Sequence, residues 1–253
     1  MMGAIAGDII GSVYEHHPIK TIDFPLFQPR SRFTDDSVLT VAVADAILNG
    51  QPYRDAVLAW GQRYPNAGYG STFIRWLQTD DPVPYHSWGN GSAMRVGPVG
   101  WAFDTEDEVL YQAKRSAEIT HNHPEGIKGA QATALAVYLA RTGAAKATIR
   151  ERIQSQFGYD LARTAESIRP AYRFDVSCQG TVPEALIAFL DTESYEDAVR
   201  AAVSLGGDAD TLACIAGAVA EAFYGGVPES IRAAVRARLT PELWAVVEAF
   251  ERR

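Results

Sequence analysis

Residues 206–225, GGDADTLACIAGAVAEAFYG, combine a polar turn with the apolar segment that follows it. The apolar part, 212–225, predicts a helix, and four small residues share one of its faces at the spacing i, i+3, i+4, i+7: Ala213, Ala216, Gly217 and Ala220. Small residues on one face let two helices approach closely, so we expect this helix at the centre of the domain. Core packing alone explains such a face, and function must come from the polar ends.

Helical signals continue along nearly the whole chain. Thr240-Pro241 is typical of an N-cap followed by proline at the first helical position, and Thr181 with Glu184 has capping-box spacing, with Pro183 in the first turn. Runs of alternating β-branched residues are almost absent, which predicts one all-α, multi-helix domain over residues 1–253. Further helices are predicted over 38–49, 53–64, 109–119, 124–142, 147–157, 195–204 and 228–238. Segments 16–33 and 79–100 are predicted to be irregular, and long loops are often functional.

Composition narrows the function classes. The chain has 253 residues, 47% of them hydrophobic, and a formal net charge of -8. The acidic balance makes nucleic acid an unlikely partner, because neutralising phosphates needs clustered Lys and Arg. No apolar run approaches the roughly 20 residues that span a bilayer, so we expect no membrane association. Only Cys178 and Cys214 are present, and they form neither a disulfide framework nor a zinc pattern, which favours a cytoplasmic location.

Two acidic clusters stand at the heads of predicted helices. Asp208, Asp210 and Thr211 follow a glycine pair, and Thr34-Asp35-Asp36 precedes the helix predicted over 38–49. A capping role explains one of these residues in each cluster but not two carboxylates. Hard divalent cations prefer oxygen ligands, so the two clusters predict one metal site assembled from distant parts of the chain.

Three further segments carry candidate polar groups. In the first, Asp8 interrupts an apolar segment and Glu15 follows it; a buried carboxylate needs a partner. The second, 87–95, combines glycines with polar residues that could cradle phosphate oxygens, and its Trp88 could stack on a base or pack in the core. In the third, His121 and His123 precede a helix near Pro124 and could contact substrate, bind metal or cap the helix.

These segments occur in an order that resembles the ADP-ribosylglycohydrolase family. That family includes the enzymes that remove ADP-ribose from dinitrogenase reductase, vertebrate hydrolases of ADP-ribosylated arginine or serine, and some jellyfish lens crystallins. Each motif is weak alone, and the ordered set is specific. The matching motifs are Gly7-Asp8, Gly11-Ser12, Tyr14-Glu15, Thr34-Asp35-Asp36, Gly89-Asn90-Gly91, Ala93-Met94-Arg95, Thr120-His121 and 206–211.

The resemblance implies an all-α fold of orthogonal helices around a centre of two divalent cations, Mg²⁺ or Mn²⁺. By position, the implied metal ligands are Thr34, Asp35, Asp36, Asp208, Asp210 and Thr211. Glu15 matches a glutamate beside the metals that acts in ligation or gating. The loop around the diphosphate and adjoining sugar is matched by Ser87, Trp88, Gly89 and Asn90, and His121 matches a histidine of the substrate cleft. A tyrosine is usual at the position of Trp88.

The implied reaction is hydrolysis of the bond between the distal ribose of ADP-ribose and a protein side chain or small molecule, with ADP-ribose as product. The residues implied as catalytic are Asp35 or Asp36, which would activate water, with Glu15 as the alternative. Two other readings stay open: a non-catalytic ADP-ribose-binding or crystallin-like protein, and a metal-dependent phosphohydrolase of nucleotide diphosphates. The acceptor, whether arginine, serine or another group, would be determined by the loops at 16–33 and 64–88.

Overall fold

Two small-sided helices, α1 (Met2–Gly11) and α13 (Ala209–Tyr224), pack against each other at the centre of the computed structural model, which describes residues 1–253. The contact is closer than any side chain allows: a Cβ on Gly7 would lie 2.0 Å from the carbonyl oxygen of Ala213. The facing pairs show that the helices run antiparallel: Gly3 with Gly217, Gly7 with Ala213, and Gly11 with Ala209. Close backbone packing therefore fixes the C-terminal half of α1 against the N-terminus of α13.

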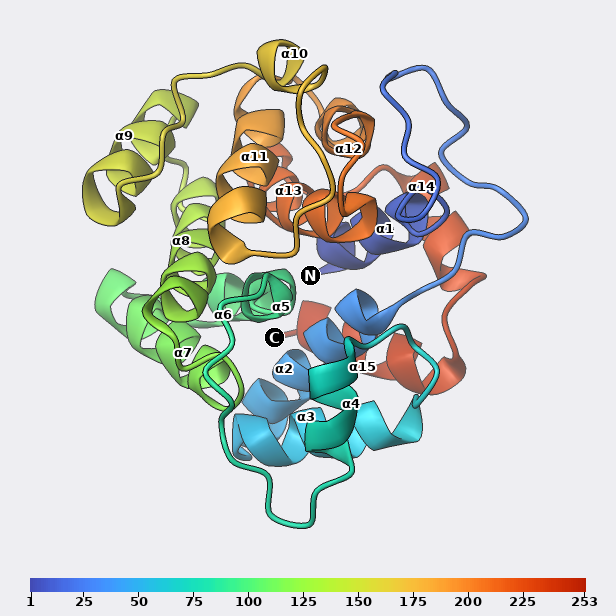
Figure 1. The fold of residues 1–253 in the computed structure, drawn as a ribbon, viewed down its shortest axis with the longest axis vertical. Coiled ribbons are helices and arrows are strands. Elements are labelled where there is room, and N and C mark those ends of the chain that lie inside the picture. The colour runs from blue at the N-terminus through green and yellow to red at the C-terminus, as the bar shows by residue number, and fades with distance from the viewer.

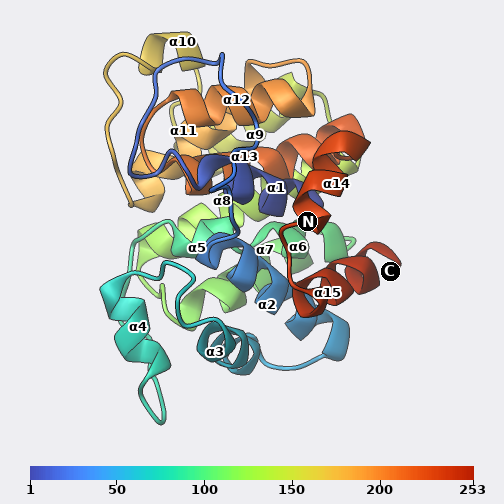
Figure 2. The same ribbon diagram turned by 90° about the vertical axis from the view of Figure 1, so that its right-hand side faces the viewer.

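The other helices surround this central pair (Figures 1 and 2). In Figure 2, α9 to α12 lie above it, whereas α2, α3, α4, α7 and α15 lie below. The remaining bounds are α2 (Asp35–Asn49), α3 (Tyr53–Arg63), α4 (Ser71–Leu77), α5 (Gly91–Met94), α6 (Gly97–Ala102), α7 (Glu106–Glu118), α8 (Pro124–Arg141), α9 (Lys146–Phe157), α10 (Ala165–Ile168), α11 (Cys178–Leu190), α12 (Tyr195–Ser204), α14 (Glu229–Arg236) and α15 (Pro241–Glu251).

The all-α prediction is confirmed. The structure has no strand, only an isolated antiparallel bridge between Gly89 and Ser177. The central position predicted for the small-sided helix is also confirmed, since residues 209–222 of α13 are all buried. The cap at Thr240 forms as expected, because its side chain accepts a hydrogen bond from the backbone N–H of Leu243. None of the helices combines the length and apolar character that crossing a bilayer requires.

Two sequence predictions were wrong in detail. The capping box at Thr181 and Glu184 does not form, because Ser177 caps α11 by accepting from the N–H of Gly180, and Pro183 lies inside the helix. Segment 79–100 is not wholly irregular, since α5 and the start of α6 lie within it. The sequence prediction also omitted α1, whose glycines have low helix propensity and whose stability comes from packing on α13.

Candidate functional site

A cleft of about 550 Å³ opens where the N-terminal ends of α2 and α13 meet the loop before α5. We name three parts of its lining. The acidic floor consists of Glu15, Asp35, Asp36, Asp208 and Asp210. The donor wall consists of residues 87–91 and His121, with Arg95 behind them. The neutral wall consists of Gly68, Gly70, Ser71, Thr72 and Phe73.

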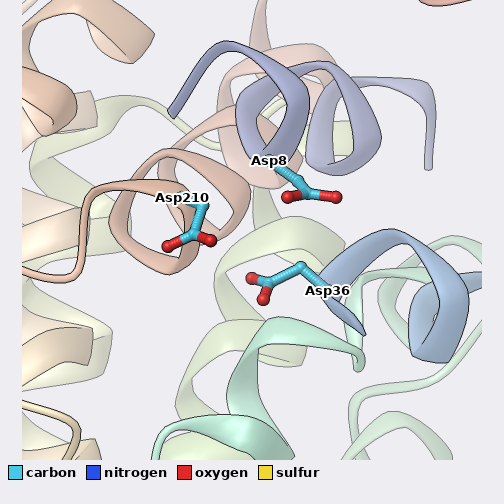
Figure 3. A group of neighbouring side chains, drawn as sticks. All are labelled: Asp8, Asp36 and Asp210. Carbon is cyan, nitrogen blue, oxygen red and sulfur yellow. The ribbon is translucent and has the colours of Figure 1, made fainter. Parts of the chain in front are cut away.

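The acidic floor is built from two helix N-termini. Asp36 and Asp210 each occupy the second position of their helix, α2 and α13, and Asp208 is the residue that precedes α13. Negative charge is favoured at a helix N-terminus, which offsets part of the cost of gathering these carboxylates. Figure 3 shows the side chains of Asp36 and Asp210 pointing toward each other and toward Asp8 from α1. The packing of α1 on α13 thus brings three distant acidic segments together.

The carboxylates form two groups that share one member. Asp8, Asp36 and Asp210 each offer an oxygen within 4.8 Å of the others, and so do Glu15, Asp208 and Asp210. The hydroxyl of Thr211 lies 3.4 Å from Asp36 Oδ2 and links the two helix ends. The two groups therefore meet at Asp210.

Without a counter-charge these carboxylates resist ionisation. Burial, aided by the negative charge of Asp8, raises the pKa of Asp35 to about 8. Burial and neighbouring carboxylates also raise the pKa values of Asp36 and Asp210 well above their ordinary range. A buried cluster of this kind favours either bound protons or bound cations.

Asp8 differs from its neighbours because its oxygens already have partners. Its Oδ1 accepts from the hydroxyl of Thr34 at 2.7 Å, and its Oδ2 accepts from the N–H groups of Thr34 at 2.9 Å and Ser37 at 3.1 Å, as well as from the Ser37 hydroxyl. Burial raises the pKa of Asp8 to about 6, although these bonds act to lower it. The sequence prediction that Asp8 needs a buried partner is confirmed, and its partners orient the cap of α2.

Asp36 and Thr34 differ from Asp8 because each has an oxygen with unused hydrogen-bonding capacity. Asp36 Oδ1 is buried and has no hydrogen-bond partner, so one carboxylate oxygen has lost water without compensation. The Thr34 hydroxyl donates to Asp8 and accepts from the N–H of Asp36 at 3.3 Å, which leaves one lone pair. An orphaned carboxylate oxygen within an all-oxygen donor set fits a hard divalent cation such as Mg²⁺ or Mn²⁺.

The donor wall is held by backbone pairing and by Asn90. The N–H of Asn90 donates to the carbonyl of Val176 at 2.7 Å, and its side-chain amide donates to Asp208 Oδ2 at 2.7 Å and to Thr181 Oγ1 at 3.1 Å. Asn90 therefore ties the donor wall to the acidic floor. Trp88 stands at the mouth of the cleft with 49% of its surface exposed, which leaves its ring free to stack on a planar ligand.

A buried arginine and a buried histidine complete the donor wall. Arg95 is fully buried without a carboxylate partner, and its Nη2 donates to the Ser116 carbonyl and to Thr120 Oγ1, each at 2.9 Å. Burial, with the charge of Arg95 adding to it, lowers the pKa of His121 well below its ordinary value. The imidazole of His121 is therefore neutral at physiological pH, beside a fixed positive charge.

The cleft gathers nearly every residue that the sequence singled out. The predicted residues at its lining are Glu15, Asp35, Asp36, Ser87, Trp88, Gly89, Asn90, His121, Asp208, Asp210 and Thr211. Thr34 is buried behind them. His123 caps α8, as one sequence alternative held, by accepting from the N–H of Glu125. No separate role was predicted for Asp8 or Arg95, and Tyr85 and Phe174 at the lining were not predicted.

The chain is similar to known proteins of one family. The family model described as ADP-ribosylglycohydrolase matches residues 1–253. ADP-ribosylhydrolase ARH3 of Mus musculus is 27% identical, over 91% of this chain and 84% of its own length. ADP-ribosylarginine hydrolase Tri1 of Pseudomonas putida is 24% identical, over 89% of this chain and 69% of its own length. A solved structure named as an ADP-ribosylglycohydrolase-related protein complex has a TM-score of 0.77 and 25% identity, over 99% of this chain and 96% of that one.

Proposed function

Because the chain belongs to the ADP-ribosylglycohydrolase family, we propose that it hydrolyses the bond between the distal ribose of ADP-ribose and an acceptor and releases ADP-ribose. The observation that carries this proposal is the pairing of an acidic floor with a donor wall in one cleft. The floor suits cations that hold a sugar diol, and the wall suits phosphate oxygens.

The proposed ligands of two divalent cations, Mg²⁺ or Mn²⁺, are the oxygens of Thr34, Asp35, Asp36, Asp208, Asp210 and Thr211, with Glu15 at the edge of the site. Asp210 lies close both to Asp36 and to the pair Glu15 and Asp208, which supports a site for two cations rather than one. When bound, such cations supply positive charge that orients the ribose hydroxyls and stabilises charge on oxygen.

Asp35 is our candidate for the residue that activates water. Asp35 lines the cleft but belongs to neither of the two carboxylate groups that share Asp210. A cation would therefore coordinate its oxygens less fully than those of Asp36. A carboxylate near the anomeric carbon can take the proton of the attacking water and stabilise oxocarbenium character at that carbon. Glu15, a partly exposed residue of the floor, is the alternative base.

The donor wall is the proposed site of the ADP portion. The side chains of Ser87 and His121 and the backbone of 87–91 would contact the diphosphate and the adjoining sugar, and Trp88 would stack against a planar group. No carboxylate belongs to this wall, so an anion approaches it without like-charge repulsion. Arg95 adds a buried positive charge behind it.

The neutral wall is the proposed site of the leaving group. Its five residues carry no charge, so beyond the acidic floor nothing there would pair with a guanidinium. This favours an uncharged acceptor, such as a serine-type hydroxyl, over arginine. Gly68 lies against the floor, since a Cβ there would be 3.3 Å from Asp35 Oδ1, and this wall is therefore next to the candidate base.

The test is product analysis with two substrates, a serine-linked and an arginine-linked ADP-ribosyl peptide, each with Mg²⁺ or Mn²⁺. We expect free ADP-ribose from both and faster turnover of the serine-linked peptide. AMP with a phosphoribosyl peptide would instead indicate a diphosphate phosphohydrolase, and ADP-ribose binding without turnover would indicate a non-catalytic protein. Asp210→Asn should be inactive, and Asp80→Asn, in an exposed loop outside the cleft, is the matched control.

A further inference from the structure

Thr120 lies between the guanidinium of Arg95 and the imidazole of His121, and its hydroxyl hydrogen has only one available acceptor. Thr120 Oγ1 lies 2.9 Å from Arg95 Nη2 and 2.7 Å from His121 Nδ1, with no other hydrogen-bond partner. A guanidinium can only donate, so the hydroxyl accepts from Arg95. The hydroxyl hydrogen then points to His121 Nδ1, which must accept it.

The opposite assignment leaves a buried group unpaired. If Nδ1 carried the proton, Thr120 Oγ1 would receive two hydrogens and its own hydrogen would have no acceptor. Thr120 is fully buried, so no water compensates, and an unmade hydrogen bond there is costly. A charged imidazole has the same defect and is further opposed by burial and by Arg95, which hold the pKa of His121 well below its ordinary value.

The other ring nitrogen, His121 Nε2, is directed at the cleft. It has no hydrogen-bond partner within the protein, and a Cβ on Gly91 would lie 3.2 Å from it, so the glycine leaves the space open. A Cβ on Gly89 would lie 3.5 Å from the same atom. Alanine at position 91 would crowd the nitrogen that the cleft exposes.

We propose that Arg95 and Thr120 form a relay that fixes His121 as its Nε2–H tautomer, so that the donor wall always presents a hydrogen-bond donor to an anionic oxygen of the ligand. His121 is the ligand-contacting residue, and Arg95 and Thr120 are positioning residues that act through it. The identity of the ligand as ADP-ribose rests on the proposed function, whereas the tautomer does not.

The relay is tested by long-range proton–nitrogen NMR of histidine-labelled protein, with the signal of His121 assigned from a His121→Gln variant among the five histidines. We expect a single Nε2–H tautomer in the wild type at neutral pH. Thr120→Val, which removes only the hydroxyl, should lose this single tautomer, and Thr120→Ser should keep it. A wild-type His121 that is charged or protonated at Nδ1 would overturn the relay.

The donor role is tested by calorimetry with ADP-ribose in the presence of Mg²⁺. We expect about tenfold weaker binding for Thr120→Val, because a hydrogen bond to a charged group is lost, and restored binding for Thr120→Ser. Mn²⁺ affinity should not change, and Thr142→Val, on the exposed end of α8, is the matched control. Unchanged ADP-ribose affinity after loss of the tautomer would overturn the donor role. Failure of the wild type to bind ADP-ribose would overturn the donor role and the proposed function together, and the NMR result would still decide the relay.

Discussion

The acidic floor and the donor wall line the same cleft, and both are built on buried polar groups. The floor has an excess of acidic groups, whereas the wall has a basic group without an acidic partner. The floor gathers carboxylates whose pKa values burial has raised, and one oxygen of Asp36 has no partner. The wall holds Arg95 without a carboxylate and His121 in its neutral form. The floor therefore suits cations and the wall suits an anion, and a hydrogen bond from Asn90 to Asp208 joins the two.

Substitution of Asp210 should have the largest effect on metal affinity and turnover. Asp210 belongs to both carboxylate groups, so Asp210→Asn removes charge from both proposed cation positions at once. Loss of an outer partner of a metal ligand commonly costs roughly 10- to 100-fold, and loss of a shared ligand should exceed the upper figure in both Mn²⁺ affinity and turnover. Calorimetry and product release measure the two effects. Near-wild-type Mn²⁺ affinity in this variant would refute the assignment of the floor.

A substitution beneath the floor should have a smaller effect with a different signature. Asp8→Asn replaces an acceptor that receives bonds from Thr34 and Ser37, so an amide N–H would face donors. We expect about 10- to 100-fold weaker Mn²⁺ binding, because Thr34 loses its orientation. We also expect a loss of about 2 kcal/mol in the free energy of unfolding of the metal-free protein. Chemical denaturation with chelator measures the stability. Unchanged stability with unchanged metal affinity would contradict the role of Asp8.

The stability of the metal-free protein should also depend on pH. The pKa values of Asp8 and Asp35, about 6 and about 8, lie above their unfolded values, so the folded metal-free protein binds more protons. This contribution is complete below about pH 4 and is lost as pH rises toward about 8. The melting temperature of chelator-treated protein should therefore fall between pH 6 and about pH 8, and Mn²⁺ should remove the fall by favouring the ionised carboxylates. A metal-free melting temperature that rises over this range would contradict the account of the floor.

The smallest effect on ligand affinity is expected at the mouth of the donor wall, where Trp88 lies. Trp88 is half exposed, so Trp88→Ala removes a stacking surface without opening the core. Stacking of one base on an aromatic ring contributes about 1–3 kcal/mol, and because Trp88 is half exposed we expect the lower end of this range, roughly fivefold in ADP-ribose affinity. Mn²⁺ affinity should be unchanged. Tyr111→Ala, an equally exposed aromatic on α7, is the control, and equal ADP-ribose affinities for the two variants would show that Trp88 does not stack.

The sequence predicted those parts of the molecule that local rules control. The small-residue spacing of α13 and the cap at Thr240 depend on neighbouring residues, and both predictions were confirmed. The helix α1 was missed because Gly3, Gly7 and Gly11 are poor helix formers whose helix is stabilised by the distant α13. Tertiary packing decided that element, and the available signal was the spacing of these glycines at i, i+4, i+8, the same one-face pattern of small residues that predicted α13.

The same division applies to the cleft. The acidic motifs were visible as unusual pairs of carboxylates, but the sharing of Asp210 between two groups depends on how α1, α2 and α13 meet. Arg95 belongs to a motif that the sequence analysis singled out, but nothing in its neighbourhood in the sequence indicates burial without a counter-charge. Its partner Thr120 lies 25 residues away, and only the fold places the guanidinium behind His121.

We propose that the acidic floor holds two cations that are needed to release ADP-ribose from a substrate bound at the donor wall. The most direct measurement is a Mn²⁺ titration of chelator-treated protein, with bound metal and released ADP-ribose followed together on a serine-linked ADP-ribosyl peptide. The account predicts two cations per chain, no turnover before they bind, and neither binding nor turnover for Asp210→Asn. Full release of ADP-ribose in the presence of chelator would contradict it.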